Sequence, residues 1–126
     1  MSCEDVAERA VFTVRQGDDW SRVWSRTSGG AVYSGSLLVQ IRQGVDSSAP
    51  LVASSAVITD VPVIDVSGTD LEADPPTVSM MIPAEATAMF EPHGTFTIEA
   101  ECVVDGMVTT IMTHRLFVVP QVAVRS

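Results

Sequence analysis

The strongest constraint on the fold is a regular alternation of side chains near the C-terminus. Residues 95–104 carry apolar side chains at every second position, namely Phe96, Ile98, Ala100 and Cys102, with Thr97, Glu99 and Glu101 between them. A period of two is typical of a β-strand with one buried face. Asp105-Gly106 separates this segment from a second, largely apolar one at 107–119. An Asp-Gly pair in that position predicts a tight β-hairpin.

Similar alternation recurs along the chain and predicts further strands. Gly17-Asp18-Asp19 and Ser28-Gly29-Gly30 interrupt it, and residues 44–50 and 67–76 have the composition of loops. The predicted strands cover 10–16, 20–26, 36–43, 51–59, 61–66, 77–82, 95–104 and 107–119. About seven or eight short strands favour an all-β, antiparallel sandwich or barrel. Strands do not alternate with helices, so a parallel sheet is not expected.

One short helix and a single domain complete the predicted organisation. Pro83 suits the first turn of a helix and alanines follow it, which predicts a short helical turn near residues 83–90. A chain of 126 residues fits one domain. We therefore expect an N-terminal arm at 1–9, a β-sandwich domain at 10–120 and a C-terminal tail at 121–126.

The charge of the chain excludes some classes of partner. The sequence has 16 Asp plus Glu residues against 7 Lys plus Arg, which gives a formal net charge of -9. A field of this sign repels phosphate, so we expect neither nucleic acid nor an anionic membrane as partner. Every basic residue is an arginine. This bias is compatible with a GC-rich genome, and it also suits bidentate contacts at protein interfaces.

The N-terminus and the cysteines carry no sign of export. Residues 1–10 are charged and polar, unlike a secretory signal, and no apolar run approaches the length of a membrane span. The expected compartment is the cytoplasm in which the chain is made. Cys102 belongs to the alternating apolar set, which predicts a buried thiol, whereas Cys3 lies in the N-terminal arm. A disulfide between them is conceivable, but no feature of the sequence supports it.

Neither histidine lies in a pattern typical of catalysis. His93 is in a Pro-His-Gly turn and His114 in a predicted strand, and Glu99 or Glu101 could be imagined as an acid partner. Nucleophilic catalysis also requires a positioned Ser or Cys and an orienting third group. The sequence holds no Gly-x-Ser-x-Gly elbow. We expect an exposed turn residue, an exposed strand residue and no enzyme activity.

Two acidic clusters are the candidates for a metal site. They are Asp18-Asp19 and the set Asp70, Glu72 and Asp74. Ca²⁺ requires about six or more oxygen ligands held in a tight loop. The second cluster lacks the glycine-centred spacing of a calcium loop. We expect solvated turn carboxylates, with neither a metal nor a cofactor.

Trp20 and Trp24 lie on one face of a predicted strand and admit two interpretations. A tryptophan buries a large area, so packing in the core or at a subunit interface is the simpler one. The other is an aromatic platform for sugars, which requires that at least one of the two rings is exposed. The methionines are likewise expected to be packing residues.

Three segments, taken in order, resemble a known family. They read FTVRQGDDWSRVW at 12–24, YSGSLLVQIRQG at 33–44 and PAEATAMFEPHGTFTIEAECVVDGMV at 83–108. Together they resemble the small immunoglobulin-like virion proteins of tailed bacteriophages, and are similar to the N-terminal domain of the baseplate upper protein. Residues 31–38, which read AVYSGSLL, and 52–66 depart from the family's usual pattern. The resemblance implies an immunoglobulin-like sandwich, a structural role in the virion and no catalytic residues.

The sequence therefore predicts a non-enzymatic virion protein that docks by protein–protein contacts. It would be a capsid decoration (minor capsid) or a tail or baseplate component, made in the host cytoplasm, with capsid or tail proteins and further copies of itself as partners. The two terminal segments are candidate docking arms. The alternative is a carbohydrate-binding adhesion module, and a small hydrolase or metalloprotein is a third hypothesis. Candidate interface residues are Trp20, Trp24, Phe117 and Val119.

Overall fold

The computed structural model describes residues 8–25, 32–46, 48–73 and 75–120, so both predicted docking arms lie largely outside the described residues. Within these ranges no helix has the length and apolar character needed to cross a membrane. The elements are β1 (Glu8–Arg15), β2 (Trp20–Ser25), β3 (Tyr33–Gln43), β4 (Leu51–Ser54), β5 (Thr77–Ile82), α1 (Ala84–Thr87), β6 (Thr95–Val104) and β7 (Met107–Val119).

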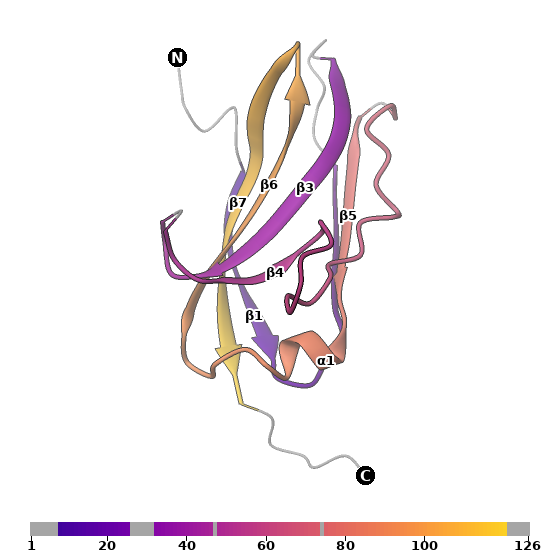
Figure 1. Ribbon diagram of the computed structural model, residues 1–126. Coiled ribbons are helices and arrows are strands. Elements are labelled where there is room, and N and C mark those ends of the chain that lie inside the picture. Colours follow the sequence, from indigo (N-terminus) through magenta and orange to yellow (C-terminus); the bar gives the residue numbers. More distant parts are fainter. Residues whose placement is uncertain (1–7, 26–31, 47, 74, 121–126) are drawn as a thin grey trace.

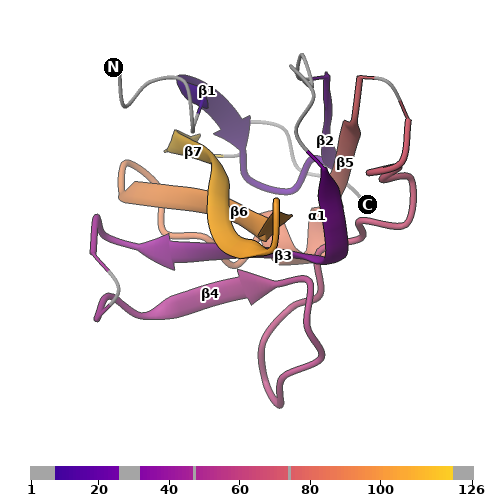
Figure 2. The same ribbon diagram turned by 90° about the horizontal axis from the view of Figure 1, so that it is seen from above.

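These strands form two sheets that face each other, as the all-β sandwich requires. The large sheet has the order β1-β7-β6-β3-β4, and the small sheet consists of β2 and β5. Figures 1 and 2 show the large sheet curving around one side of the small sheet, with α1 at one end of the sandwich. The predicted all-β sandwich with a helical turn near 83–90 is confirmed, and all but one of the described strand pairings are antiparallel.

The predicted hairpin joins β6 and β7 at the middle of the large sheet. Asp105 and Gly106 adopt φ values of 51° and 84°. These positive angles are the ones that a two-residue hairpin turn of type I′ requires, and Asp and Gly tolerate them best. The turn sets the register Val104↔Met107, and β6 also pairs antiparallel with β3.

One pairing in the large sheet is parallel, which the sequence did not lead us to expect. Phe12 and Val14 of β1 lie beside Leu116 and Val118 of β7, with the two strands running in the same direction. The Gln16 amide continues the pairing by donating to the Val119 carbonyl over 2.9 Å. Parallel neighbours usually require a crossover connection. Here the whole sandwich lies between the two strands in sequence, so no local pattern reveals the pairing.

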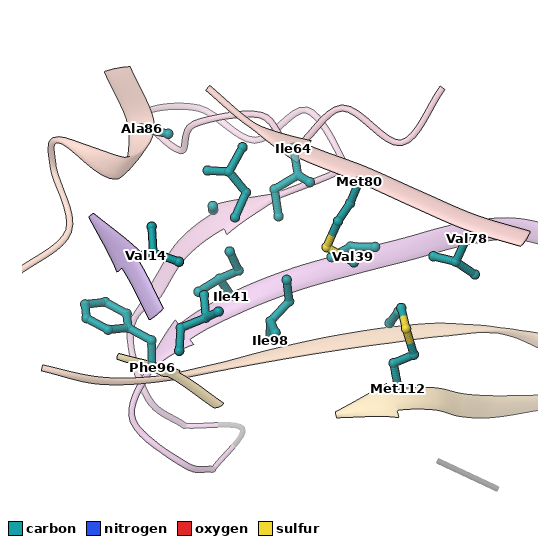
Figure 3. Close-up of a cluster of buried hydrophobic side chains, with 14 of the residues drawn as sticks. Val14, Val39, Ile41, Ile64, Val78, Met80, Ala86, Phe96, Ile98 and Met112 are labelled. Atoms are coloured by element: carbon teal, nitrogen blue, oxygen red, sulfur yellow. The ribbon is translucent and has the colours of Figure 1, made fainter. Parts of the chain in front are cut away.

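The core lies between the two sheets and follows the predicted alternation. Ile98 and Met112 of the large sheet point toward the side of Val78 and Met80 of the small sheet, and Phe96 lies at the other end of the cluster near Val14 (Figure 3). Cys102 is also buried, as predicted. Burying a large apolar side chain such as Ile98 or Met112 contributes roughly 1.5–3 kcal/mol relative to leaving it exposed.

Two predicted strands are shorter in the structure or absent. The segment predicted at 51–59 ends as a strand at Ser54, and residues 61–66 form only isolated bridges such as Asp65↔Met81. Pro62 has no amide proton to donate, and Asp60 has a φ of 65°, which turns the chain. Residues 61–66 therefore form a loop, and the Ile64 side chain of this loop is buried in the core.

A buried threonine ties α1 to the turn between β1 and β2. The Thr87 hydroxyl accepts a hydrogen bond from the Gly17 amide at 3.1 Å and donates to the Asp18 carbonyl at 2.7 Å. The Asp19 carboxylate accepts from the Ala84 amide at 2.7 Å, at the start of the helix. The Gly-Asp-Asp turn and the Pro83–Met89 segment are therefore one polar unit, here called the Thr87 anchor.

We expect Thr87→Val to lower the free energy of unfolding by about 1–3 kcal/mol, because it leaves a half-buried amide and a half-buried carbonyl without this hydroxyl partner. Valine keeps the shape and the β-branch of threonine. The measurement is urea unfolding followed by tryptophan fluorescence. The matched control Thr95→Ala, at an exposed position, should change stability by less than about 0.5 kcal/mol. Equal effects of the two substitutions would contradict the anchor.

Candidate functional site: the outer face of the large sheet

The large sheet has an outer face that no described strand or helix covers (Figure 2). We call "outer face" the side chains that point away from the core. On β7 these are Val108, Thr110, Thr113, Arg115, Phe117 and Val119, and on β6 they are Thr95, Thr97, Glu99, Glu101 and Val103. β1 adds Val11, Thr13 and Arg15, and β3 adds Leu38, Gln40 and Arg42.

Two arginines flank one threonine across the middle of this face. Thr97 of β6 pairs with Arg115 of β7 on one side and with Arg42 of β3 on the other. We call these residues the Thr97 row. Because neighbouring strands lie about 4.8 Å apart, the two arginines occupy the strand positions on either side of the threonine.

The next row along the strands is acidic. Glu99 pairs with Thr113 and Gln40, and we call these residues the Glu99 row. Successive outward residues of a strand are about 6.6 Å apart, so the Glu99 carboxylate lies next to the positive Thr97 row. Glu101, two residues further, extends the acidic side.

A shallow depression of about 290 Å³ lies on the β3–β6 half of the face. Its lining residues are Leu38, Gln40, Arg42, Val45, Asp46, Thr97, Glu99 and Glu101. Arg42 is held in place there, because its guanidinium donates to the Ala49 carbonyl at 2.9 Å and to the Gln40 side-chain oxygen at 3.4 Å. Arg115 on the other side of Thr97 is exposed.

The outer face concentrates the positive charge of the molecule. Arg15, Arg42 and Arg115 belong to it, out of four arginines whose side chains the structure describes. The acidic residues on its strands are Glu99 and Glu101. The face is thus close to neutral or slightly positive, whereas the chain as a whole has a charge of -9.

Exposed apolar side chains lie among these charges. Phe117 is 44 % exposed, Val11 71 % and Val108 74 %. The His93 ring lies 6.0 Å from the Phe117 ring. Aromatic side chains and arginines are both enriched at protein interfaces, and a polar rim around apolar residues is typical of them.

Behind the outer face, His114 lies in the core and not on the surface. It is 1 % exposed, its ring stacks on Trp24 at 4.9 Å, and the edge of Phe12 lies 5.0 Å away. The prediction of an exposed strand residue was wrong here. Leu116 and Val118 are buried, and they lie two and four residues after His114 on β7. Because every second residue of a strand faces the same side, His114 also points inward.

The His114 ring is held in a neutral state. Neither ring nitrogen has a hydrogen-bond partner among the described residues. Burial, and to a lesser extent the positive charge of Arg22, lower the pKa of His114 from 6.5 to about 4. The Arg22 guanidinium lies 4.4 Å from the centre of the Phe12 ring, which closes this side of the sandwich.

The four predicted interface residues have different surroundings. Trp24 is buried at 6 % exposure, so a partner could reach it only if β1 or β2 moved. Trp20 is half-buried beside Phe12 and Trp24, and these two tryptophans do not form the exposed platform that sugar binding requires. Phe117 and Val119 lie on the outer face. Their role at an interface stays a prediction.

Arg42, Arg115 and Val11 were not singled out from the sequence. The alternation of their strands does contain the signal. Arg42 directly follows the buried Ile41, and Arg115 directly precedes the buried Leu116. Val11 has the parity opposite to the buried Val14. What the alternation alone does not contain is the register between strands. That register places Arg42 and Arg115 on the two sides of Thr97.

The imagined catalytic pairs are not brought together. His114 pairs with Ile98 and points into the core, so Glu99 and Glu101 lie on the opposite face of the sheet. His93 is an exposed turn residue with a φ of 65°, as the turn prediction implies.

Carboxylates of both acidic clusters accept hydrogen bonds from backbone amides, and Asp74 lies outside the described residues. The Asp19 carboxylate binds the helix start in the Thr87 anchor, and the Asp70 carboxylate accepts from the amides of Glu72 and Ala73 at 3.1 Å each. Across the described ranges, no group of three or more His, Cys, Asp or Glu residues could hold a metal ion.

We expect the stability of the protein to fall as the pH is lowered from 6.5 toward 4. In that window the unfolded chain protonates His114 and the folded chain does not. The free energy of unfolding should therefore drop by about 1.4 kcal/mol per pH unit, or roughly 3 kcal/mol in all. Hydrogen bonds from Ser48 and Ser67 lower the pKa values of Asp46 and Asp65 below 3.8, so these carboxylates titrate below the window.

Denaturant unfolding at a series of pH values measures this slope. His114→Leu should remove most of it. The control His93→Asn, at an exposed position where asparagine tolerates the positive φ, should retain it. A slope that survives in His114→Leu would contradict the assignment to the buried imidazole.

Comparison with known proteins supports the fold and nothing finer. No protein-family model and no curated protein matches the chain. A solved structure from a study of multimeric cell-adhesive interactions of VGSC beta subunits matches with a TM-score of 0.51 and 11 % identity, over 94 % of this chain and 96 % of that one. The extracellular domain of the voltage-gated sodium channel beta4 subunit matches with a TM-score of 0.45 and 15 % identity, over 93 % and 96 % of the chains.

A third solved structure, the periplasmic chaperone SfaE, matches with a TM-score of 0.44 and 14 % identity, over 95 % of this chain and 58 % of that one. At such low identities these similarities concern the fold alone. Together with the strand order, the first of them shows that the chain folds as an immunoglobulin-like β-sandwich.

Proposed function

We propose that this chain is a non-enzymatic structural protein of a tailed-bacteriophage virion, which docks on other subunits of the particle through the outer face of the large sheet. It acts as a capsid decoration or as a tail or baseplate component. The family resemblance of the three sequence segments supports the viral setting. The composition of the outer face supports docking by protein–protein contacts.

The observation that carries docking is the exposure of Phe117 and Val11 among arginines on an uncovered sheet face. Apolar side chains of this size gain free energy when a partner removes them from water. The guanidinium of Arg115 can form bidentate hydrogen bonds to a carboxylate or a backbone carbonyl. A face with both features is selective for a protein surface of matching shape and charge.

The acidic remainder of the molecule supports this division of roles. A net charge of -9 resists unspecific association. The outer face, by contrast, is locally balanced. Copies can therefore accumulate before assembly and still dock through one defined surface.

Mass spectrometry of phage particles tests the proposal. The particles are purified by density gradient from cells infected with the phage whose genome encodes this chain. We expect peptides of the chain at an amount stoichiometric with the major structural proteins. Particles that lack the chain, although it is made in the same cells, would refute the proposed function.

We expect Phe117→Ser to reduce incorporation of the chain into particles by about tenfold, because it removes the main apolar side chain of the docking face. The chain is supplied as a tagged copy during infection, and its amount in purified particles is measured. The matched control Val57→Ser changes a loop residue that is 89 % exposed, and should be incorporated normally. Equal incorporation of all three proteins would exclude the outer face as the docking surface.

A further inference from the structure

We infer that the outer face binds the same face of a second copy of this chain, with the strands of the two large sheets antiparallel across a two-fold axis. This inference rests on the proposed docking face, and it names one occupant of that face. The argument uses the registers of β3, β6 and β7 and the charges that these registers align.

The two-fold axis lies between the two faces, parallel to the sheets and perpendicular to the strands. Such an axis reverses the strand direction. It places β6 of one copy over β6 of the other, and β7 over β7. With the axis between the Thr97 row and the Glu99 row, the Glu99 row of each copy lies over the Thr97 row of the other. The Glu99 carboxylate of each copy is then flanked by Arg42 and Arg115 of the second copy.

The charge pattern selects this arrangement over the parallel one. A two-fold axis along β6 would keep the strand direction and exchange β3 with β7. Arg42 of one copy would then face Arg115 of the other, and Glu99 would face Glu99. Like charges in direct opposition repel, whereas the antiparallel arrangement makes the opposite-charge contact twice by symmetry.

The same register brings the two ends of β7 from the two copies together. Thr113 and Arg115 exchange places across the axis, so Thr110 lies over Phe117 of the second copy and Val108 lies over Val119. Val108 is 74 % exposed in the single copy. Two sheets packed face to face accommodate such side chains at a separation of about 10 Å, with a strand crossing of about 30°.

Sedimentation equilibrium of the purified chain over a range of concentrations tests the inference. The wild type should self-associate to a dimer, and Glu99→Arg or Arg115→Glu should each raise the dissociation constant by about tenfold or more. The double variant E99R/R115E should bind more tightly than Glu99→Arg, because position 99 then meets one opposite charge and the unchanged Arg42 instead of two like charges. Glu85→Arg makes the same charge change on α1, away from the face, and should leave self-association unchanged.

Thermal unfolding of each variant shows whether the fold is intact, since all of these positions are exposed. A wild type that is monomeric at every concentration overturns the inference. So does a dimer that tolerates both single charge reversals, or a double variant as weak as Glu99→Arg. A monomeric chain that is nevertheless present in phage particles overturns this inference alone, whereas a dimer absent from particles overturns the proposed function alone.

Discussion

The register between β3, β6 and β7 is the constraint on which the rest of the structure depends. On β6, Phe96, Ile98 and Ala100 point into the core, and the residues between them form the outer face. A shift of one residue would move every side chain to the opposite face. The Asp105-Gly106 turn and the burial of the apolar set fix this register together. The same register therefore determines both the core and the row of arginines around Thr97.

The small sheet is too narrow to cover the inner face of the large sheet by itself. α1 closes one end through Ala86 and the Thr87 anchor, and the loop residue Ile64 fills space beside β4. On the other side, Phe12 and Trp24 enclose the His114 ring. Each closure uses groups from distant parts of the chain. This explains why polar contacts such as those of Thr87 are buried within a largely apolar core.

Local patterns predicted most of the fold, and non-local contacts account for what they missed. The hairpin at Asp105 and the helical turn after Pro83 follow from the residues themselves. The parallel β1–β7 pair and the loop character of residues 61–66 depend on partners far away in sequence. The burial of His114 could be inferred from the parity of Leu116. A register irregularity between Ala100 and Glu101, which buries both Ile111 and Met112, breaks the simple alternation of β7.

Only some residues of the candidate site could be predicted from the sequence. Phe117 and Val119 were predicted from their position in an apolar strand end, while the arginine row required the strand order. The structure also favours docking through a face over docking through a strand edge. β2 is short, and Arg22 lies across the open side of the sandwich on the Phe12 ring. Short edge strands and charged side chains at an edge oppose the addition of another strand. With that edge protected, the uncovered sheet face is where apolar surface and balanced charge coincide.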